Sequence, residues 1–295
     1  KTNMASRAKK VSGRKTVGLA LGGGGARGLA HVGVIRALRR AGIPIDYIAG
    51  TSMGALVGAF YAATQDTEAL EAAFLRLDRR DVMPIGRILA KKDGVLFRDP
   101  RIIDFLEKTF DGRRIESCAV PFAAVATDVK TGEAVVLKKG SLASAVRASI
   151  ALPIIFPPVA REKRLLMDGG FSNPVPADVV RAMGADVVIA VDVTSRWVNI
   201  ADELVSVKNL YGIVSNALSV VEYQISRQIL KTADLVLRPP VLQYGWLSFD
   251  MAPQLITAGD EEVGMNIEKI CRAAGVKRPN EPALDKFFAF LRSGT

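Results

Sequence analysis

Residues 43–63 read IPIDYIAGTSMGALVGAFYAA, and their pattern indicates the class of fold. The apolar run over 43–49 predicts a buried strand, and the apolar residues over 53–63 predict a buried helix. Between them, Gly50-Thr51-Ser52-Met53-Gly54 is a G-x-S-x-G sequence. Gly50 and Gly54 omit the side chains that would crowd a sharp turn from a strand into a helix. The stretch therefore predicts a strand, a tight turn that exposes the Ser52 hydroxyl, and a helix.

The preceding segment, residues 16–40, shows the same order of a strand, a turn and a helix. Residues 16–21 (TVGLAL) form a short apolar run, four glycines follow, and residues 26–40 repeat apolar side chains at helical spacing. Two consecutive strand–helix units predict a parallel sheet with helices on both faces. We also expect helices over 66–77, 101–110, 142–150, 201–230 and 254–274. Further strands are expected over 122–128, 133–138, 164–167, 187–193 and 234–238. We predict one α/β domain over residues 16–295, preceded by a basic, disordered tail over residues 1–15.

The glycine-rich loop Gly22-Gly23-Gly24-Gly25-Ala26-Arg27-Gly28 joins the first predicted strand to the first helix. Its backbone N–H groups lie at the positive end of a helix, which is a favourable place for an anion. The anion could be a phosphate or a transient oxyanion. Gly23, Gly25 and Gly28 also fit the spacing of a dinucleotide fingerprint, and Asp46 lies near the position of its ribose-binding acid. The loop alone leaves both readings open.

The serine turn favours acyl transfer. Neighbouring parallel strands deliver the glycine-rich loop and Ser52 to the same edge of the sheet. A serine nucleophile beside free backbone N–H groups is the arrangement that an acyl-transfer reaction requires. We expect the oxyanion hole to be formed by the N–H groups of Gly23, Gly24, Gly25 and Ala26. Arg27 and Gly28 are expected to support the loop, although Arg27 could also attract a lipid phosphate.

A serine nucleophile needs a base, and the chain has one histidine, His31. His31 lies within the first predicted helix among apolar neighbours, so we expect it to pack rather than to accept the proton. Asp168 follows the predicted strand over 164–167 and precedes Gly169 and Gly170, which allow a close-packed turn. Partial burial would raise the pKa of Asp168 and make it a stronger base. We therefore predict a Ser52–Asp168 pair, with Gly169 and Gly170 as support.

Composition excludes several other classes. The net charge is +10, and the first fifteen residues contain six basic and no acidic side chains. Such a tail is attracted to anionic membranes, whereas no nucleic-acid-binding module accompanies it, so we expect no nucleic-acid partner. Only Cys118 and Cys271 are present, which argues against a disulfide framework or a structural metal site. With no secretory signal visible, we expect a cytoplasmic protein, peripheral at the membrane.

The motifs together resemble the patatin-like phospholipase family. The resemblance rests on the glycine-rich loop at 22–28, the GTSMG turn at 50–54 and Asp168-Gly169-Gly170. The stretch RASIALP at 147–153, followed by Phe156-Pro157, also resembles the family. Within it, the chain looks most similar to bacterial members related to the neuropathy-target-esterase catalytic domain. The resemblance implies a three-layer α/β/α fold with a mostly parallel central sheet, and a Ser–Asp dyad. It also implies hydrolysis of lipid acyl esters, of the phospholipase A or lysophospholipase type, without a metal or cofactor.

Other functions stay open at this point. One alternative is a nucleotide-binding protein that uses the glycine-rich loop, and another is a non-catalytic regulator on the same fold. An acyltransferase would use the same acyl-enzyme but pass the acyl group to an alcohol instead of water. The sequence does not specify the head group, the acyl chain, an activator or the oligomeric state.

Overall fold

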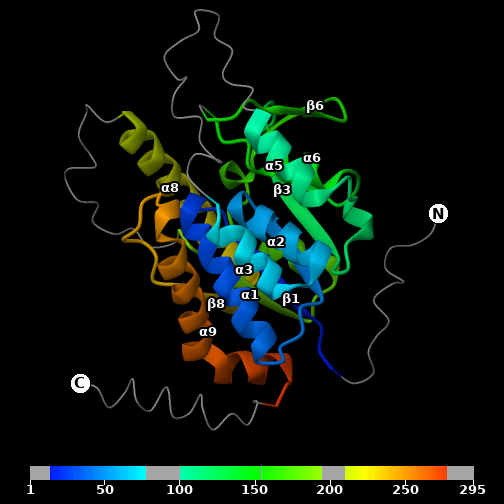
Figure 1. Ribbon diagram of the computed structural model, residues 1–295, viewed down its shortest axis with the longest axis vertical. Helices are drawn as coiled ribbons and strands as arrows, with labels where there is room; N and C mark the ends of the chain where they lie inside the picture. The colour runs from blue at the N-terminus through cyan, green and yellow to red at the C-terminus, as the bar shows by residue number, and fades with distance from the viewer. Residues whose placement is uncertain (1–13, 78–99, 154, 195–209, 278–295) are drawn as a thin grey trace, which may run out of the picture.

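The computed structural model describes residues 14–77, 100–153, 155–194 and 210–277. An eight-stranded sheet runs through this part of the chain. Its strands are β1 (Val17–Leu21), β2 (Tyr47–Thr51), β3 (Phe122–Asp128), β4 (Ala134–Leu137), β5 (Val159–Arg161), β6 (Arg164–Asp168), β7 (Val187–Val191) and β8 (Leu235–Leu237). The helices are α1 (Ala30–Arg40), α2 (Met53–Thr64), α3 (Thr67–Leu75), α5 (Pro100–Phe110), α6 (Leu142–Ser149), α7 (Ala177–Met183), α8 (Leu210–Ile229) and α9 (Ala252–Ala274). Figure 1 shows α1, α2 and α3 in front of the sheet, with α9 beside α1.

The sheet has the order β5-β6-β3-β2-β1-β7-β8, and β4 pairs with β3. Strands β1, β2, β3, β7 and β8 pair in parallel, whereas β4, β5 and β6 join through antiparallel ladders. The predicted mostly parallel central sheet is therefore confirmed, with an antiparallel extension at one side. Parallel strands buried on both faces explain why the central strands are apolar throughout.

Side chains along the central strands alternate between two apolar layers. In β1, Leu19 and Leu21 face the layer that contains α1, α2 and α9, whereas Ala20 faces the layer of α7. Strand β3 alternates in the same way, with Ala124 on the first face and Val125 on the second. Because successive side chains of a strand point to opposite faces, one sheet separates two helical layers. The predicted three-layer α/β/α architecture is confirmed.

One edge of β3 carries two different partners in succession. The N–H of Ile48 in β2 donates to the carbonyl of Pro121, just before β3. The N–H of Val129, just after β3, donates to the carbonyl of Leu165 in β6. Backbone groups of alternate residues lie on the same edge of a strand, so positions 121 and 129 face the same way. The N–H of Asp128 faces β4 on the opposite edge.

Strands β2 and β6 consequently meet end to end along β3. Thr51, the last residue of β2, is paired with Val125, and Asp168, the last residue of β6, is paired with Ala126. The two strands run in opposite directions, because β2 is parallel and β6 antiparallel to β3. The residue after one strand and the last residue of the other are thus brought together at the centre of β3.

Most predicted boundaries of the described elements lie within two residues of the observed ones, but two elements begin later than predicted. The helix expected over 26–40 begins as a 3-10 segment, η2 (Gly25–Leu29), and becomes α-helical at Ala30. The N–H of Ala26 donates to the Trp246 carbonyl, which holds this first turn in contact with a distant loop. The strand expected over 43–49 begins at Tyr47 and continues to Thr51. Residues 201–209 of the predicted helix over 201–230 lie outside the described residues.

Among the α-helices and strands of the described residues, β5 and α7 were not predicted. Strand β5 has three residues, too few for an alternating pattern to be recognised. Helix α7 has seven residues and ends at Gly184, whose φ of 110° is a left-handed helix cap. Such a glycine is a helix-end signal in the sequence, but so short a helix carries little periodicity of its own.

Candidate active site

Ser52 lies on the sharp turn between β2 and α2. Its backbone has φ 52° and ψ −123°, a conformation that residues with a side chain rarely adopt. A Cβ atom on Gly50 would lie 2.4 Å from the Gly54 carbonyl oxygen, and one on Gly54 would lie 2.2 Å from that of Leu21. Both positions therefore require glycine because the turn packs backbone against backbone. This is the strained strand–turn–helix geometry predicted for the segment.

Asp168 reaches Ser52 across the junction of β2 and β6. The Ser52 hydroxyl donates a hydrogen bond of 2.7 Å to Asp168 Oδ2, and the Gly170 N–H donates one of 2.8 Å to Asp168 Oδ1. The Asp168 side chain is buried, and burial raises the pKa of this carboxyl to about 6, although the two hydrogen bonds lower it. A carboxylate with a pKa near neutrality is a better proton acceptor than an exposed one. The structure thus brings the two predicted residues into hydrogen-bonding contact.

Ser149, at the end of α6, fills the gap between the two strand ends. Its hydroxyl donates to the carbonyl of Val125 at 2.6 Å and accepts from the N–H of Ser52 at 2.9 Å. Ser149 is fully buried. Its hydroxyl takes the place of a sheet partner between the ends of β2 and β6, and so holds the strained turn. Sequence reasoning noted the 147–153 stretch but assigned no role to this serine.

Positions 169 and 170 after Asp168 are both glycine, but for different structural reasons. A Cβ atom on Gly169 would lie 2.3 Å from the Val125 carbonyl oxygen, so this residue must be small for the turn to pack against β3. A Cβ atom on Gly170 would lie 2.4 Å from Glu222 Oε1. Both therefore allow close packing, as predicted, but against different elements.

The glycine-rich loop passes beside the serine. A Cβ atom on Gly23 would lie 3.4 Å from Ser52 Cβ. The Gly23 N–H donates to Pro174 and the Ala26 N–H to Trp246, each at 2.9 Å. Gly24 and Gly25 have positive φ angles of 148° and 58°, and no hydrogen bond from their N–H groups occurs within the described residues. Of the four predicted oxyanion-hole donors, only Gly24 and Gly25 have N–H groups without a hydrogen bond within the described residues.

Arg27 and Gly28 attach the loop to its surroundings. Arg27 Nε donates to the carbonyl of Tyr244 at 2.8 Å, which ties η2 to the loop that follows β8. A Cβ atom on Gly28 would lie 2.5 Å from the Met53 side chain, so glycine lets η2 approach the first turn of α2. Both contacts agree with the support that was predicted for these residues.

His31 does not contact Ser52. Its ring is fully buried in α1, and Nε2 lies 2.7 Å from the Gly22 carbonyl oxygen, to which the N–H of this nitrogen donates. Burial lowers the pKa of His31 to about 4, against a smaller raising effect of that hydrogen bond. The ring is therefore neutral near pH 7. Its contact fixes the start of the glycine-rich loop, a role that sequence reasoning missed in treating His31 as a packing residue.

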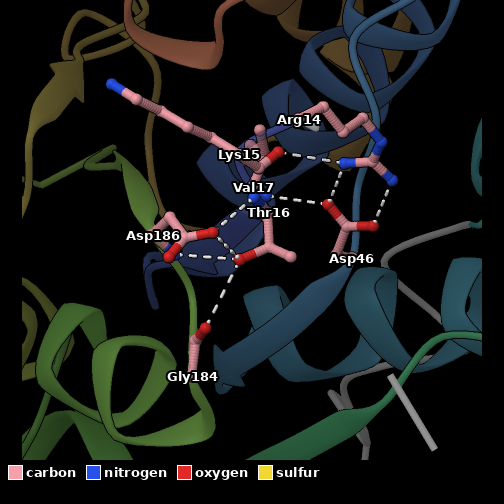
Figure 2. Close-up of polar contacts among 7 residues, drawn as sticks. All are labelled: Arg14, Lys15, Thr16, Val17, Asp46, Gly184 and Asp186. Atoms are coloured by element: carbon pink, nitrogen blue, oxygen red, sulfur yellow. Dashed lines mark hydrogen bonds and ion pairs between the residues drawn. The ribbon is translucent and has the colours of Figure 1, made fainter. Parts of the chain in front are cut away.

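Asp46 lies directly before β2, at the opposite end of this strand from Ser52 (Figure 2). Its two carboxylate oxygens accept hydrogen bonds of 2.6 and 2.8 Å from Arg14, and Oδ2 also accepts one of 2.8 Å from the N–H of Val17. The glycine-rich loop follows the carboxyl end of β1. A ribose-binding acid must lie near that end, where dinucleotides bind. Asp46 therefore cannot serve in that role, and the nucleotide alternative loses one of its two supports.

The described residues contain no group of three or more His, Cys, Asp or Glu side chains that could hold a metal ion. The chemistry available at the site is that of the serine hydroxyl, the Asp168 carboxyl and backbone N–H groups. A serine hydroxyl hydrogen-bonded to a buried carboxyl group is the arrangement of an activated nucleophile, and the loop beside it has two N–H groups that are not engaged within the described residues.

Comparison with known proteins identifies the family. Residues 19–181 match the family described as patatin-like phospholipase. A patatin-like phospholipase domain-containing protein of Caenorhabditis elegans is 40% identical over 194 residues, which cover 64% of this chain and 14% of that protein. Human patatin-like phospholipase domain-containing protein 6 is 37% identical over 195 residues, which cover 65% of this chain and 14% of that protein.

A larger share of one bacterial relative is covered by the match. An uncharacterized NTE family protein of Mycobacterium bovis is 39% identical over 198 residues, which cover 62% of this chain and 54% of that protein. The chain thus spans only part of these relatives. Among solved structures, that of VipD from Legionella pneumophila aligns with a TM-score of 0.49 and 13% identity, over 83% of this chain and 67% of VipD. By the match over residues 19–181, the chain belongs to the patatin-like phospholipase family.

Proposed function

We propose that the chain is a serine hydrolase of lipid acyl esters, of the phospholipase A or lysophospholipase type. One observation carries the proposal: the 2.7 Å hydrogen bond from the Ser52 hydroxyl to the buried Asp168 carboxylate, on a strained turn beside the glycine-rich loop. Family membership supports an ester of a lipid as the substrate. The relatives' names describe phospholipase domains, and the family match over residues 19–181 includes both Ser52 and Asp168.

In the proposed reaction, Ser52 Oγ attacks the ester carbonyl while its proton passes to Asp168 Oδ2. The negative charge that forms on the carbonyl oxygen is stabilised by the N–H groups of Gly24 and Gly25, without a metal or cofactor. Collapse of this intermediate breaks the ester bond, and the leaving alkoxide takes the proton from Asp168. Water then attacks the acyl-Ser52 ester, gives a proton to Asp168, and releases the carboxylic acid with Ser52 restored by that proton.

Reaction with a fluorophosphonate tests the chemistry. The reagent phosphonylates an activated serine, and mass mapping of the product should place the label on Ser52. We expect Ser52→Ala to abolish labelling and Asp168→Asn to reduce it strongly, whereas Ser117→Ala, a change of an exposed serine in η3 (Ile115–Ser117), serves as the control. Absence of label on Ser52 in the wild-type protein would refute the hydrolase function and favour a non-catalytic regulator.

The substrate and the acyl acceptor need separate assays. A panel of p-nitrophenyl esters of increasing chain length would report acyl preference, and lysophospholipids with different head groups would report head-group preference. Release of free fatty acid distinguishes a hydrolase from an acyltransferase, which would transfer the acyl group to an added alcohol. An NAD-dependent rise in melting temperature would instead favour the nucleotide-binding alternative.

Peripheral contact with an anionic membrane is part of the proposal. Val129 and Leu165 lie next to each other on the β3–β6 ladder and are 41% and 43% exposed. Exposed Lys130, Lys163 and Arg164 lie beside them in the sequence. No helix of the described part of the chain combines the length and apolar character needed to cross a bilayer. Sedimentation with vesicles that contain phosphatidylserine, compared with neutral vesicles, would test the contact; equal binding would contradict it.

A further inference from the structure

Glu222, on α8, is a buried acid that the reaction above does not use. Its side chain is 1% exposed, and its Oε2 atom has no hydrogen-bond partner among the described residues. Helix α8 packs against η4 (Gly169–Phe171), the short turn that follows Asp168. Buried polar atoms are ordinarily paired, so an unpaired carboxyl oxygen beside a reactive centre requires an explanation.

The carboxyl group of Glu222 fits between the two halves of the site. A Cβ atom on Gly170 would lie 2.4 Å from Glu222 Oε1 and 3.2 Å from Asp168 Oδ1. A Cβ atom on Gly23 would lie 3.5 Å from the same Glu222 oxygen and 3.4 Å from Ser52 Cβ. Glu222 thus occupies the space that the missing side chain of Gly170 leaves free, and it lies within van der Waals distance of the glycine-rich loop at Gly23.

The charges around Glu222 disfavour its ionisation. Burial raises the pKa of Glu222 well above its ordinary value, and the neighbouring Asp168 and Asp192 carboxylates raise it further, whereas Arg27 lowers it. On α8 itself, the Arg227 guanidinium lies over the Tyr223 ring. An acid whose pKa is raised by folding makes folding less favourable as pH rises, because the unfolded chain loses the proton first. Glu222 is therefore not explained by a contribution to stability.

We propose that Glu222 is a positioning residue whose carboxyl group separates the glycine-rich loop from the Asp168–Gly170 turn and so aligns Asp168 with Ser52. The inference rests on the function proposed above. It also accounts for glycine at position 170, since any larger residue there would displace the acid. An uncharged amide of the same shape should do the same work, whereas a small apolar residue should not.

The first test compares two substitutions by the second-order rate of fluorophosphonate labelling. Glu222→Ala should lower this rate by about tenfold or more, because a small misplacement of a reacting pair has a large effect on rate. Glu222→Gln should recover most of that loss. Labelling of Glu222→Ala at the wild-type rate, or of Glu222→Gln as slowly as Glu222→Ala, would overturn the proposal. If the wild-type protein itself is not labelled at Ser52, the hydrolase function fails first.

The second test separates a positioning role from a structural one. Gly170→Ala should slow labelling in the wild-type background, where the added methyl group meets the Glu222 carboxyl. In the Glu222→Ala background the same change should slow labelling less, because that contact is gone. An equal loss in both backgrounds would show that Gly170 does not accommodate Glu222 and would contradict the proposal.

The third test does not depend on activity. Between the unfolded and folded pKa values of Glu222, the folded state retains a proton that the unfolded chain has lost, so stability falls as pH rises. Glu222→Gln removes this effect, and its melting temperature relative to wild type should increase from pH 4.5 to pH 7.5. Glu261→Gln, at an exposed position of α9, is the charge-matched control. A difference in melting temperature that does not change with pH would contradict a raised pKa of Glu222 in the folded protein.

Discussion

Replacing Ser149 by alanine gives a sharp test of how the site is held. The change removes one hydroxyl and leaves two backbone groups without this partner: the buried Val125 carbonyl and the partly buried Ser52 N–H. A buried polar group that loses its partner costs about 1–3 kcal/mol, so we expect a loss of about 2–4 kcal/mol in the free energy of unfolding. For a protein of this size that corresponds to a fall of roughly 5–15 °C in melting temperature.

Activity should fall together with stability. The Ser52 N–H bond is one of the contacts that keep the turn at its positive φ, a conformation that costs about 1–3 kcal/mol by itself. Without it the turn can relax, and fluorophosphonate labelling should slow by about tenfold. Calorimetry and labelling rates would be compared with Ser144→Ala on the same helix, which removes only a 3.4 Å contact with Arg161. Effects on both quantities no larger than those of the control would refute the reasoning.

Three further outcomes follow from the described contacts. Because the pKa of Asp168 is raised to about 6, kcat/KM for a p-nitrophenyl ester should rise with pH up to about 6 and then level off. Asp168→Asn should lower the plateau value of kcat/KM by a factor of about 10²–10⁴. Gly25→Ala should abolish turnover, since its Cβ would meet a backbone oxygen at 2.5 Å, whereas Gly42→Ala, also at positive φ but with nothing within 4 Å, should retain it. His31 takes up a proton in the unfolded chain near pH 6.5 but in the folded protein only near pH 4. As pH falls between these values, wild type should therefore lose up to about 3 kcal/mol relative to His31→Gln in urea unfolding. A pH-independent difference would contradict this assignment.

The sequence predicted those features that the backbone encodes locally. Gly50 and Gly54 flank a turn that tolerates no side chains, and Gly169 follows a strand that ends in an acid, so each leaves a recognisable pattern. The central strands are apolar on both faces, and their bounds were predicted to within two residues except at the start of β2. The single domain over 16–295 stays a prediction, and most of the predicted tail lies outside the described residues.

Features that depend on long-range contacts could not be predicted in this way. Which N–H groups of the glycine-rich loop are engaged depends on carbonyls of Pro174 and Trp246, far away in the chain. Ser149 and Glu222 lie at helical positions where serine and glutamate are unremarkable. Their importance arises from the gap between β2 and β6 and from the space beside Gly170, and neither exists until the chain has folded.

The meeting of β2 and β6 along one edge of β3 makes the distance between hydroxyl and carboxylate a matter of strand register. A slip of β6 by one residue would displace Asp168 by about 3.3 Å and turn its side chain to the opposite face. Conversely, residues 129–133 and the hairpin turn at Glu162–Lys163 can change in length without moving either group, provided that the ladder is kept. Natural or engineered changes that alter contacts with the substrate can therefore accumulate in those turns while Ser52 and Asp168 keep their positions.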